Sequence, residues 1–186
     1  LLFFHTGGKQ GTQVSRAVGK SVSLQQLNGA SREEFVSALR PLFNNETWPL
    51  ELAWESRPFG DVNELRAAIQ VAVLTADDSR RAALIHDYPA MDELLLADAD
   101  EAATISADRG SLGLTDLDDV QTERITELSA AYRERFDMPF VAYLDTNDTV
   151  DRVIDTGVRR LANSPEQEYR TALGEIVEIA NDRFDI

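Results

Sequence analysis

The sequence of 186 residues contains no cysteine and only two histidines, His5 and His86. Without cysteine there can be no disulfide framework, no thiolate zinc site and no cysteine nucleophile. Two histidines are too few for a histidine-built metal centre, so we expect no metal. No apolar run approaches the roughly 18 residues of a membrane-spanning helix, and residues 1–4 are too short for the core of a signal peptide. These absences predict a cytoplasmic protein without a membrane partner.

Positive charge is also scarce. The chain has 18 basic and 33 acidic residues, and three of the basic ones fall in residues 1–20, where there is no acid. The remaining chain therefore carries a net charge of −18, which repels nucleic-acid backbones and anionic membranes and predicts no nucleic-acid partner. Every cation after residue 20 is arginine, a bias that either salt adaptation or a GC-rich genome would produce. An anionic substrate would need several of these arginines at its pocket.

Residues 1–20 are rich in Gly, Thr, Ser and Gln and show no sustained hydrophobic period. We interpret them as a flexible extension or a cloning remnant. Residues 21–186 read as one folded domain, because 43% hydrophobic residues suffice for a packed core.

Nearly every segment of this domain carries helix signals. Ser31 with Glu34 forms a capping box, Asp61 is a further N-cap, and Ser164 precedes a proline at the first helical position. The predicted helices cover residues 31–40, 48–54, 61–73, 79–85, 115–136, 148 or 149 to 162, and 164–183, and a short apolar piece follows the break at Pro89 and runs through Leu96. Thr115 or Asp116 should cap the longest of them, whose expected core residues are Val120, Ile125, Leu128 and Tyr132. The sequence therefore predicts an all-α fold, a single compact domain of about seven or eight helices.

Two segments do not fit a helical pattern, and generic motifs are absent. Residues 97–114 are small, acidic and glycine-containing, which indicates a loop, and residues 138–144 form the one strand-like stretch. The sequence at residues 110–113 (GSLG) lacks the lysine of a phosphate loop, and no EF-hand loop surrounds the acids at 116–119. Without such a motif, the residues alone predict an acidic helical domain and indicate no particular function.

A series of short motifs, taken in their order along the chain, is more informative about function. The motifs are FVSALRPLF at 35–43, Trp48, AWESRPF at 53–59, LIHDYP at 84–89, Gly113-Leu114, YRERFDMPF at 132–140, RLAN at 160–163 with Glu168, and ALGEIVEIANDR at 172–183. Over about residues 23–186 this series resembles the 2-oxo-4-hydroxy-4-carboxy-5-ureidoimidazoline (OHCU) decarboxylase family of urate breakdown. Each motif is weak alone, but together their order and spacing are fairly specific.

The resemblance implies a helical, usually dimeric lyase that needs no cofactor. Family members remove a carboxylate from the OHCU ring, a small anionic heterocycle, and protonate the same carbon to give (S)-allantoin. The electrons left by CO2 can delocalise into the ring carbonyl and amidine, so the protein has only to orient the carboxylate, bind the ring heteroatoms and manage one proton. We therefore expect a homodimer with a small-molecule substrate and no cofactor.

The family's functional positions map onto this sequence one by one. Tyr88-Pro89 stands where the family has its His-Pro pair with the proton-handling histidine. The family's Ser-x-x-Glu-Gln stretch, which binds the ring, aligns with Ser106, Asp108 and Arg109. The segment that lends backbone contacts to substrate matches Phe140, Val141, Ala142, Tyr143 and Leu144. A late pocket arginine corresponds to Arg183, with Arg160 as second choice.

These assignments imply a mechanism in which Arg109 or Arg183 fixes an anion, Asp108 accepts ring N–H groups and Tyr88 supplies the proton. Each of these residues also has an alternative interpretation, in which its role is purely structural. Tyr88 could be a core or dimer-interface aromatic, Arg109 could pair with Asp108, and Arg183 could cap a helix end. Arg160 should pair with Glu168, and His86 should be a surface or helix-end histidine.

Because three reacting positions differ from the family, a second hypothesis is a catalytically inactive paralogue that binds ligands or partners. Convergence of Tyr88, Asp108 and Arg183 on one enclosed pocket would favour an enzyme or a ligand site.

Overall fold

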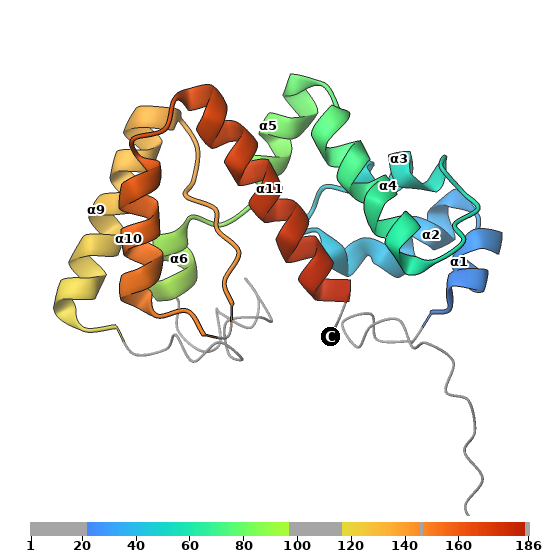
Figure 1. Cartoon of the computed structure of the whole chain (residues 1–186), viewed down its shortest axis with the longest axis horizontal. Coiled ribbons are helices and arrows are strands. Elements are labelled where there is room, and N and C mark those ends of the chain that lie inside the picture. Colours follow the sequence, from blue (N-terminus) through green and yellow to red (C-terminus); the bar gives the residue numbers. More distant parts are fainter. Residues whose placement is uncertain (1–21, 97–116, 146, 185–186) are drawn as a thin grey trace, which may run out of the picture.

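The structure, a computed structural model, describes residues 22–96, 117–145 and 147–184, and every regular element in these ranges is helical. Figure 1 shows their arrangement. The elements are α1 (Leu24–Gly29), α2 (Arg32–Leu39), the short 3-10 helix η1 (Arg40–Leu42), α3 (Trp48–Trp54), α4 (Val62–Thr75), α5 (Asp78–His86), α6 (Met91–Leu96), α9 (Asp119–Phe136), α10 (Val150–Arg160) and α11 (Pro165–Phe184). The predicted all-α class is confirmed. No described helix combines the length and the apolar character that crossing a membrane requires.

Local capping explains where most of these helices begin. Ser31 accepts from the Glu34 amide in a complete capping box, Asp61 accepts from the Glu64 amide, and the Ser164 hydroxyl accepts from the Gln167 amide. Each satisfies a backbone donor that the first turn leaves without a partner inside the helix. The three N-caps predicted from the sequence are therefore confirmed.

The start of α9 and one of its core residues were predicted wrongly. The N-cap is Asp118, which forms a reciprocal capping box with Gln121, and not Thr115 or Asp116, which lie outside the described residues. Val120 is 63% exposed, whereas Ile125, Leu128 and Tyr132 are buried as expected. The reason is helical geometry: Val120 and Ile125 are five positions apart, which places the two side chains about 140° apart around the axis.

Among the residues that the structure describes, the buried side chains form two hydrophobic cores. The first core gathers residues of α1–α5 and of α11, among them Phe35, Leu50, Leu65, Leu84 and Ile176. The second core lies between α6, α9 and α10 and includes Leu95, Ile125, Tyr132, Phe140 and Ile154. In Figure 1 α11 runs between the two groups of helices. It packs against α4, η1 and α5 on one side and α9 on the other.

A glycine allows the closest approach within the second core. A Cβ on Gly157 of α10 would clash with Leu128 of α9 and come within 2.9 Å of the Phe140 ring. Only a residue without a side chain therefore lets Phe140 pack against α10. Phe140 is the first residue of the extended segment 140–144.

Candidate functional site

Tyr88 lies immediately after α5, in the turn that leads to α6. Its side chain is 6% exposed and belongs to the first core, and its backbone N–H donates to the Ile85 carbonyl at 3.2 Å. Pro89 follows and is partly buried, and α6 begins two residues later. His86 lies in the last turn of α5 and is exposed, which confirms its prediction as a helix-end histidine. Its exposure leaves Tyr88 as the buried member of this pair.

Arg183 lies in the last turn of α11 and reaches back across the molecule. Its Nη1 donates to the Leu42 carbonyl at 2.9 Å and to the Pro41 carbonyl at 3.5 Å, and its Nη2 donates to Asn44 Oδ1 at 3.3 Å. The side chain is partly buried. Its guanidinium therefore bonds to a loop that is distant in the sequence.

Asn44 connects Arg183 to the turn that carries Tyr88. Its Nδ2 donates to the carbonyl of Asp87 at 3.2 Å, and Asp87 is the residue before Tyr88. The Asp87 carboxylate in turn accepts from the Asn45 backbone N–H at 2.7 Å and from Asn45 Nδ2 at 2.6 Å. Two predicted site residues, 95 positions apart in the sequence, are thus linked through one amide. Nothing in the sequence singled out Asn44 or Asp87, because a loop asparagine has no pattern that reveals a distant partner.

The strand-like stretch lies between the two cores as an extended chain. Phe140 is buried in the second core and Val141 in the first, while Ala142 and Leu144 pack against the second. Successive side chains of an extended chain point to opposite sides, so a segment inserted between two apolar bodies shows a strand pattern without belonging to a sheet. Within the described ranges no strand pairs with it.

Tyr143 fastens this segment to α11. Its backbone N–H donates to Glu175 Oε2 at 2.8 Å, and its hydroxyl donates to Asp182 Oδ1 at 3.1 Å. Asp182 precedes Arg183 in the chain. The extended segment therefore bonds directly to Glu175 and Asp182 of α11. Arg183 belongs to the same half of that helix and is connected to the turn of Tyr88 through Asn44.

We expect the Tyr143 phenol to ionise at a higher pH than an ordinary tyrosine, because its pKa is raised. Burial, together with the negative charge of Asp182 and the hydrogen bond to it, raises the pKa of Tyr143 to about 12. A raised pKa means that the folded state holds this proton more tightly than the unfolded state. Its contribution to stability is therefore present below about pH 10, the ordinary value, and is lost as the pH rises toward 12.

We expect the ultraviolet titration of tyrosinate to show this group, and the Tyr143→Phe variant to lack that step. Asp182→Asn should shift the step toward the ordinary value, because it removes a charge that disfavours the phenolate. Tyr169→Phe serves as the control, since it removes a different tyrosine. An unchanged titration in Asp182→Asn would contradict the assigned contact.

Arg160 belongs to a buried polar network. It is 8% exposed, and its Nε donates to Glu168 Oε1 at 2.9 Å, while Glu168 is completely buried. The other donors to Glu168 are Tyr132 Oη at 3.2 Å and Asn163 Nδ2 at 2.7 Å. Burial raises the pKa of Tyr132. The predicted Arg160–Glu168 ion pair is confirmed, and the guanidinium also lies 5.1 Å from the centre of the Phe140 ring.

The network extends from Arg160 to the segment of residues 140–144. Arg160 Nη1 donates to Glu175 Oε1 at 3.4 Å, and the other oxygen of the same carboxylate accepts the Tyr143 N–H. Arg160 therefore holds the Glu175 carboxylate that binds the predicted substrate segment, and does not bond to that segment's backbone through this contact. Ser106, Asp108 and Arg109 of the prediction lie outside the described residues.

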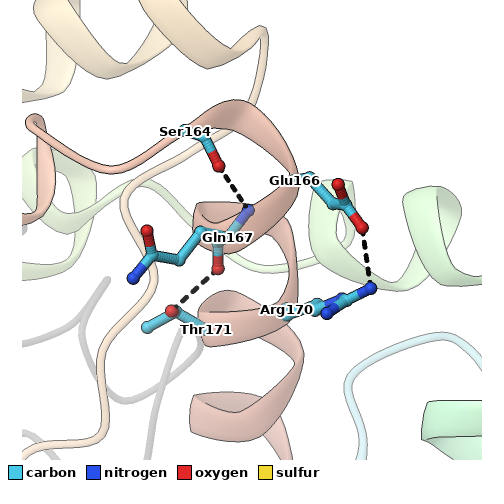
Figure 2. A pocket seen from close by; sticks show the side chains of 5 residues that line it. All are labelled: Ser164, Glu166, Gln167, Arg170 and Thr171. Atoms are coloured by element: carbon cyan, nitrogen blue, oxygen red, sulfur yellow. Dashed lines mark hydrogen bonds and ion pairs between the residues drawn. The ribbon is translucent and has the colours of Figure 1, made fainter.

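A separate surface hollow lies over the first turns of α11 (Figure 2). It is open, and its lining residues are Ser164, Glu166, Gln167, Arg170 and Thr171. Arg170 pairs with Glu166 at 2.7 Å and the Thr171 hydroxyl donates to the Gln167 carbonyl at 2.9 Å, as the dashed lines show. The hollow contains no predicted site residue. Across the described ranges no group of three or more His, Cys, Asp or Glu side chains could hold a metal ion.

Comparison with known proteins gives a consistent result. The model of a family described as OHCU decarboxylase matches residues 28–185. The 2-oxo-4-hydroxy-4-carboxy-5-ureidoimidazoline decarboxylase of Haloferax volcanii is 37% identical over 165 residues, which are 88% of this chain and 94% of that protein. The protein of the same name from Mus musculus is 32% identical over 169 residues, covering 88% of this chain and 91% of its own length.

A solved structure shares the fold. The crystal structure of an (S)-allantoin synthase superimposes with a TM-score of 0.67 and 22% identity over 88% of this chain. This chain spans 53% of that protein, about half of its length. At this identity the comparison shows a common fold and does not by itself show a common activity.

Proposed function

The chain belongs to the OHCU decarboxylase family, and on that premise we propose that it converts OHCU to (S)-allantoin and CO2 in urate breakdown. The observation that carries the proposal is the extent of the match. It runs over residues 28–185 and so takes in the second hydrophobic core, all of the first core except Leu27, and the C-terminal half of α11. Relatives up to 37% identical are decarboxylases by name, which favours this function over an inactive paralogue.

The linked positions of Tyr88, Tyr143 and Arg183 support a site at the C-terminal half of α11. In the proposed reaction Arg183 binds an anionic group of the substrate, and the backbone of residues 140–144 contacts the ring. Pro89 shapes the turn beside Tyr88. Ser106, Asp108 and Arg109 complete this proposal as ring-binding residues, with Asp108 accepting ring N–H groups. Arg160, already paired with Glu168, supports the segment from behind.

The proposed chemistry balances without an added reactant. The bond between the ring carbon and its carboxylate breaks, CO2 leaves, and the electron pair delocalises into the adjacent carbonyl and amidine. The Tyr88 hydroxyl then gives its proton to that carbon, and solvent returns a proton to the phenolate. An ordinary phenol is a weak acid with a pKa near 10, but decarboxylation itself generates a strongly basic carbon. A proton donor therefore suffices, and no strong base is needed.

Circular dichroism tests the proposal directly. OHCU is generated in situ from urate by the two preceding enzymes, this protein is added, and the optical activity of allantoin is followed. Spontaneous decay gives racemic product, so an excess of the (S) enantiomer reports catalysis. A racemate at the background rate would overturn the proposal. The homodimer and the cytoplasmic location stay predictions.

A further inference from the structure

We propose that Asn44 is a positioning residue that orients the Arg183 guanidinium for the substrate and links it to the turn of Tyr88. The inference rests on the proposed function, because it takes Arg183 as the anion-binding arginine. Asn44 lies in the loop between η1 and α3 and is partly buried. It is 139 residues from Arg183 and 43 from Asp87 in the sequence.

The hydrogen bonds fix the orientation of the Asn44 amide. A guanidinium can only donate and a backbone carbonyl can only accept. The oxygen must therefore face Arg183 Nη2, at 3.3 Å, and the nitrogen must face the Asp87 carbonyl, at 3.2 Å. Neither bond could form if the amide were turned over. Asn44 is thus a bridge with a defined direction between the arginine and the residue before Tyr88.

The acceptors that hold Arg183 suit an anion-binding role. The carbonyls of Pro41 and Leu42 and the amide oxygen of Asn44 are neutral acceptors, so these three contacts orient the guanidinium and bring no negative charge to it. An arginine held in place before binding loses less side-chain entropy when the anion arrives. In a chain of net charge −15 a cation of fixed orientation matters all the more.

The Asp87 carboxylate makes the bridge rigid at its other end. It accepts from the backbone N–H groups of Asn45 at 2.7 Å and Glu46 at 3.4 Å, and so holds the loop that carries Asn44 against the end of α5. A shift of this loop would therefore move the Tyr88 turn and the Arg183 partner together. The geometry couples the proton donor and the anion-binding group through one loop.

Steady-state kinetics of (S)-allantoin formation test the inference. We expect Asn44→Ala to raise KM for OHCU about tenfold, the scale of one lost hydrogen bond to a charged group. We expect kcat to change by less than about twofold, because substrate and transition state lose the same contact. Asn44→Ser, whose hydroxyl is too short to reach both partners, should behave alike and guards against a misfolded alanine variant. Asn45→Ala is the matched control, since it changes the neighbouring loop residue and removes only the bond from Asn45 Nδ2 to the Asp87 carboxylate.

A double-mutant cycle separates positioning from general stability. In an Arg183→Leu background, Asn44→Ala should raise KM no further, because the group that it positions is gone. The inference is overturned if the two effects on KM multiply, if Asn45→Ala raises KM as much as Asn44→Ala, or if Asn44→Ala and Asn44→Ser leave KM unchanged.

A failure of the proposed function is read separately. Racemic product from the wild-type protein would reject the decarboxylase assignment, whatever the variants do. The Asn44–Arg183 contact is then judged from the melting temperatures of the wild-type, the two single variants and the double variant. Losses in melting temperature that fall short of additive support the contact, and strictly additive losses overturn it.

Discussion

Replacing Tyr88 by phenylalanine is expected to lower kcat for OHCU roughly 10²- to 10⁴-fold, the range that a positioned proton donor contributes. The variant keeps the buried ring in the first core and removes only the hydroxyl. Because the proposed reaction protonates a carbon after CO2 has left, the loss should appear as a lower kcat and as a lower enantiomeric excess. The (S)-allantoin assay by circular dichroism measures both quantities in one experiment.

Tyr88→His is the informative companion to this variant. An imidazole has a pKa near neutrality and transfers protons more readily than a phenol at pH 7. We therefore expect this variant to turn over OHCU at least as fast as the wild-type protein. Comparable melting temperatures would show that both variants fold. Full activity in Tyr88→Phe would contradict the role of the hydroxyl and would assign Tyr88 to packing alone.

Replacing Glu168 by alanine is expected to lower the free energy of unfolding by about 3–5 kcal/mol, the usual cost of removing one partner from a buried ion pair. Glu168 is completely buried and accepts from Arg160, Tyr132 and Asn163. Its removal leaves the 8%-exposed Arg160 without its nearest carboxylate and two further donors without their acceptor. Urea or guanidinium unfolding, followed by circular dichroism, gives the change.

Two further variants show whether burial is the cause. Glu166→Ala removes a carboxylate that pairs with Arg170 on the surface of the same helix and has a side chain 76% exposed. We expect it to cost less than about 0.5 kcal/mol. The double replacement Arg160→Met with Glu168→Met should cost less than Glu168→Ala, because no buried charge is left unpaired. Similar losses in Glu166→Ala and Glu168→Ala would rule out this explanation.

The elements that sequence reasoning placed correctly are those whose causes are local. Ser31 with Glu34, Asp61 and Ser164 cap helices through residues three positions away, so their patterns are visible in any short window. The same logic also held for Asp118 with Gln121, but its neighbours Thr115 and Asp116 offered competing caps. Val120 was misplaced because it was grouped by its apolar character and not by its angle on the helix.

The candidate site depends on contacts that no local pattern encodes. The bridge from Arg183 through Asn44 to Asp87 spans 139 and 43 residues, and the Tyr143–Asp182 bond spans 39. A single sequence can nominate Tyr88 or Arg183 by resemblance, but it cannot show which polar residues face them. The Arg160–Glu168 pair was accessible because only eight positions separate its members, with Glu168 one turn into the next helix.

The position of α11 between the two cores has a consequence for the order in which they form. A chain is synthesised from its N-terminus, so packing during synthesis is limited to residues that have already been made. The second core is built from residues 91–154, so all of its members exist before α11 is made. The first core begins at Leu27 but includes six residues of α11, from Ala172 to Phe184. The half of the molecule that is translated first is therefore the half that is completed last. The hydrogen bonds that hold Arg183 span 139 to 142 positions, and contacts of such high sequence separation form slowly.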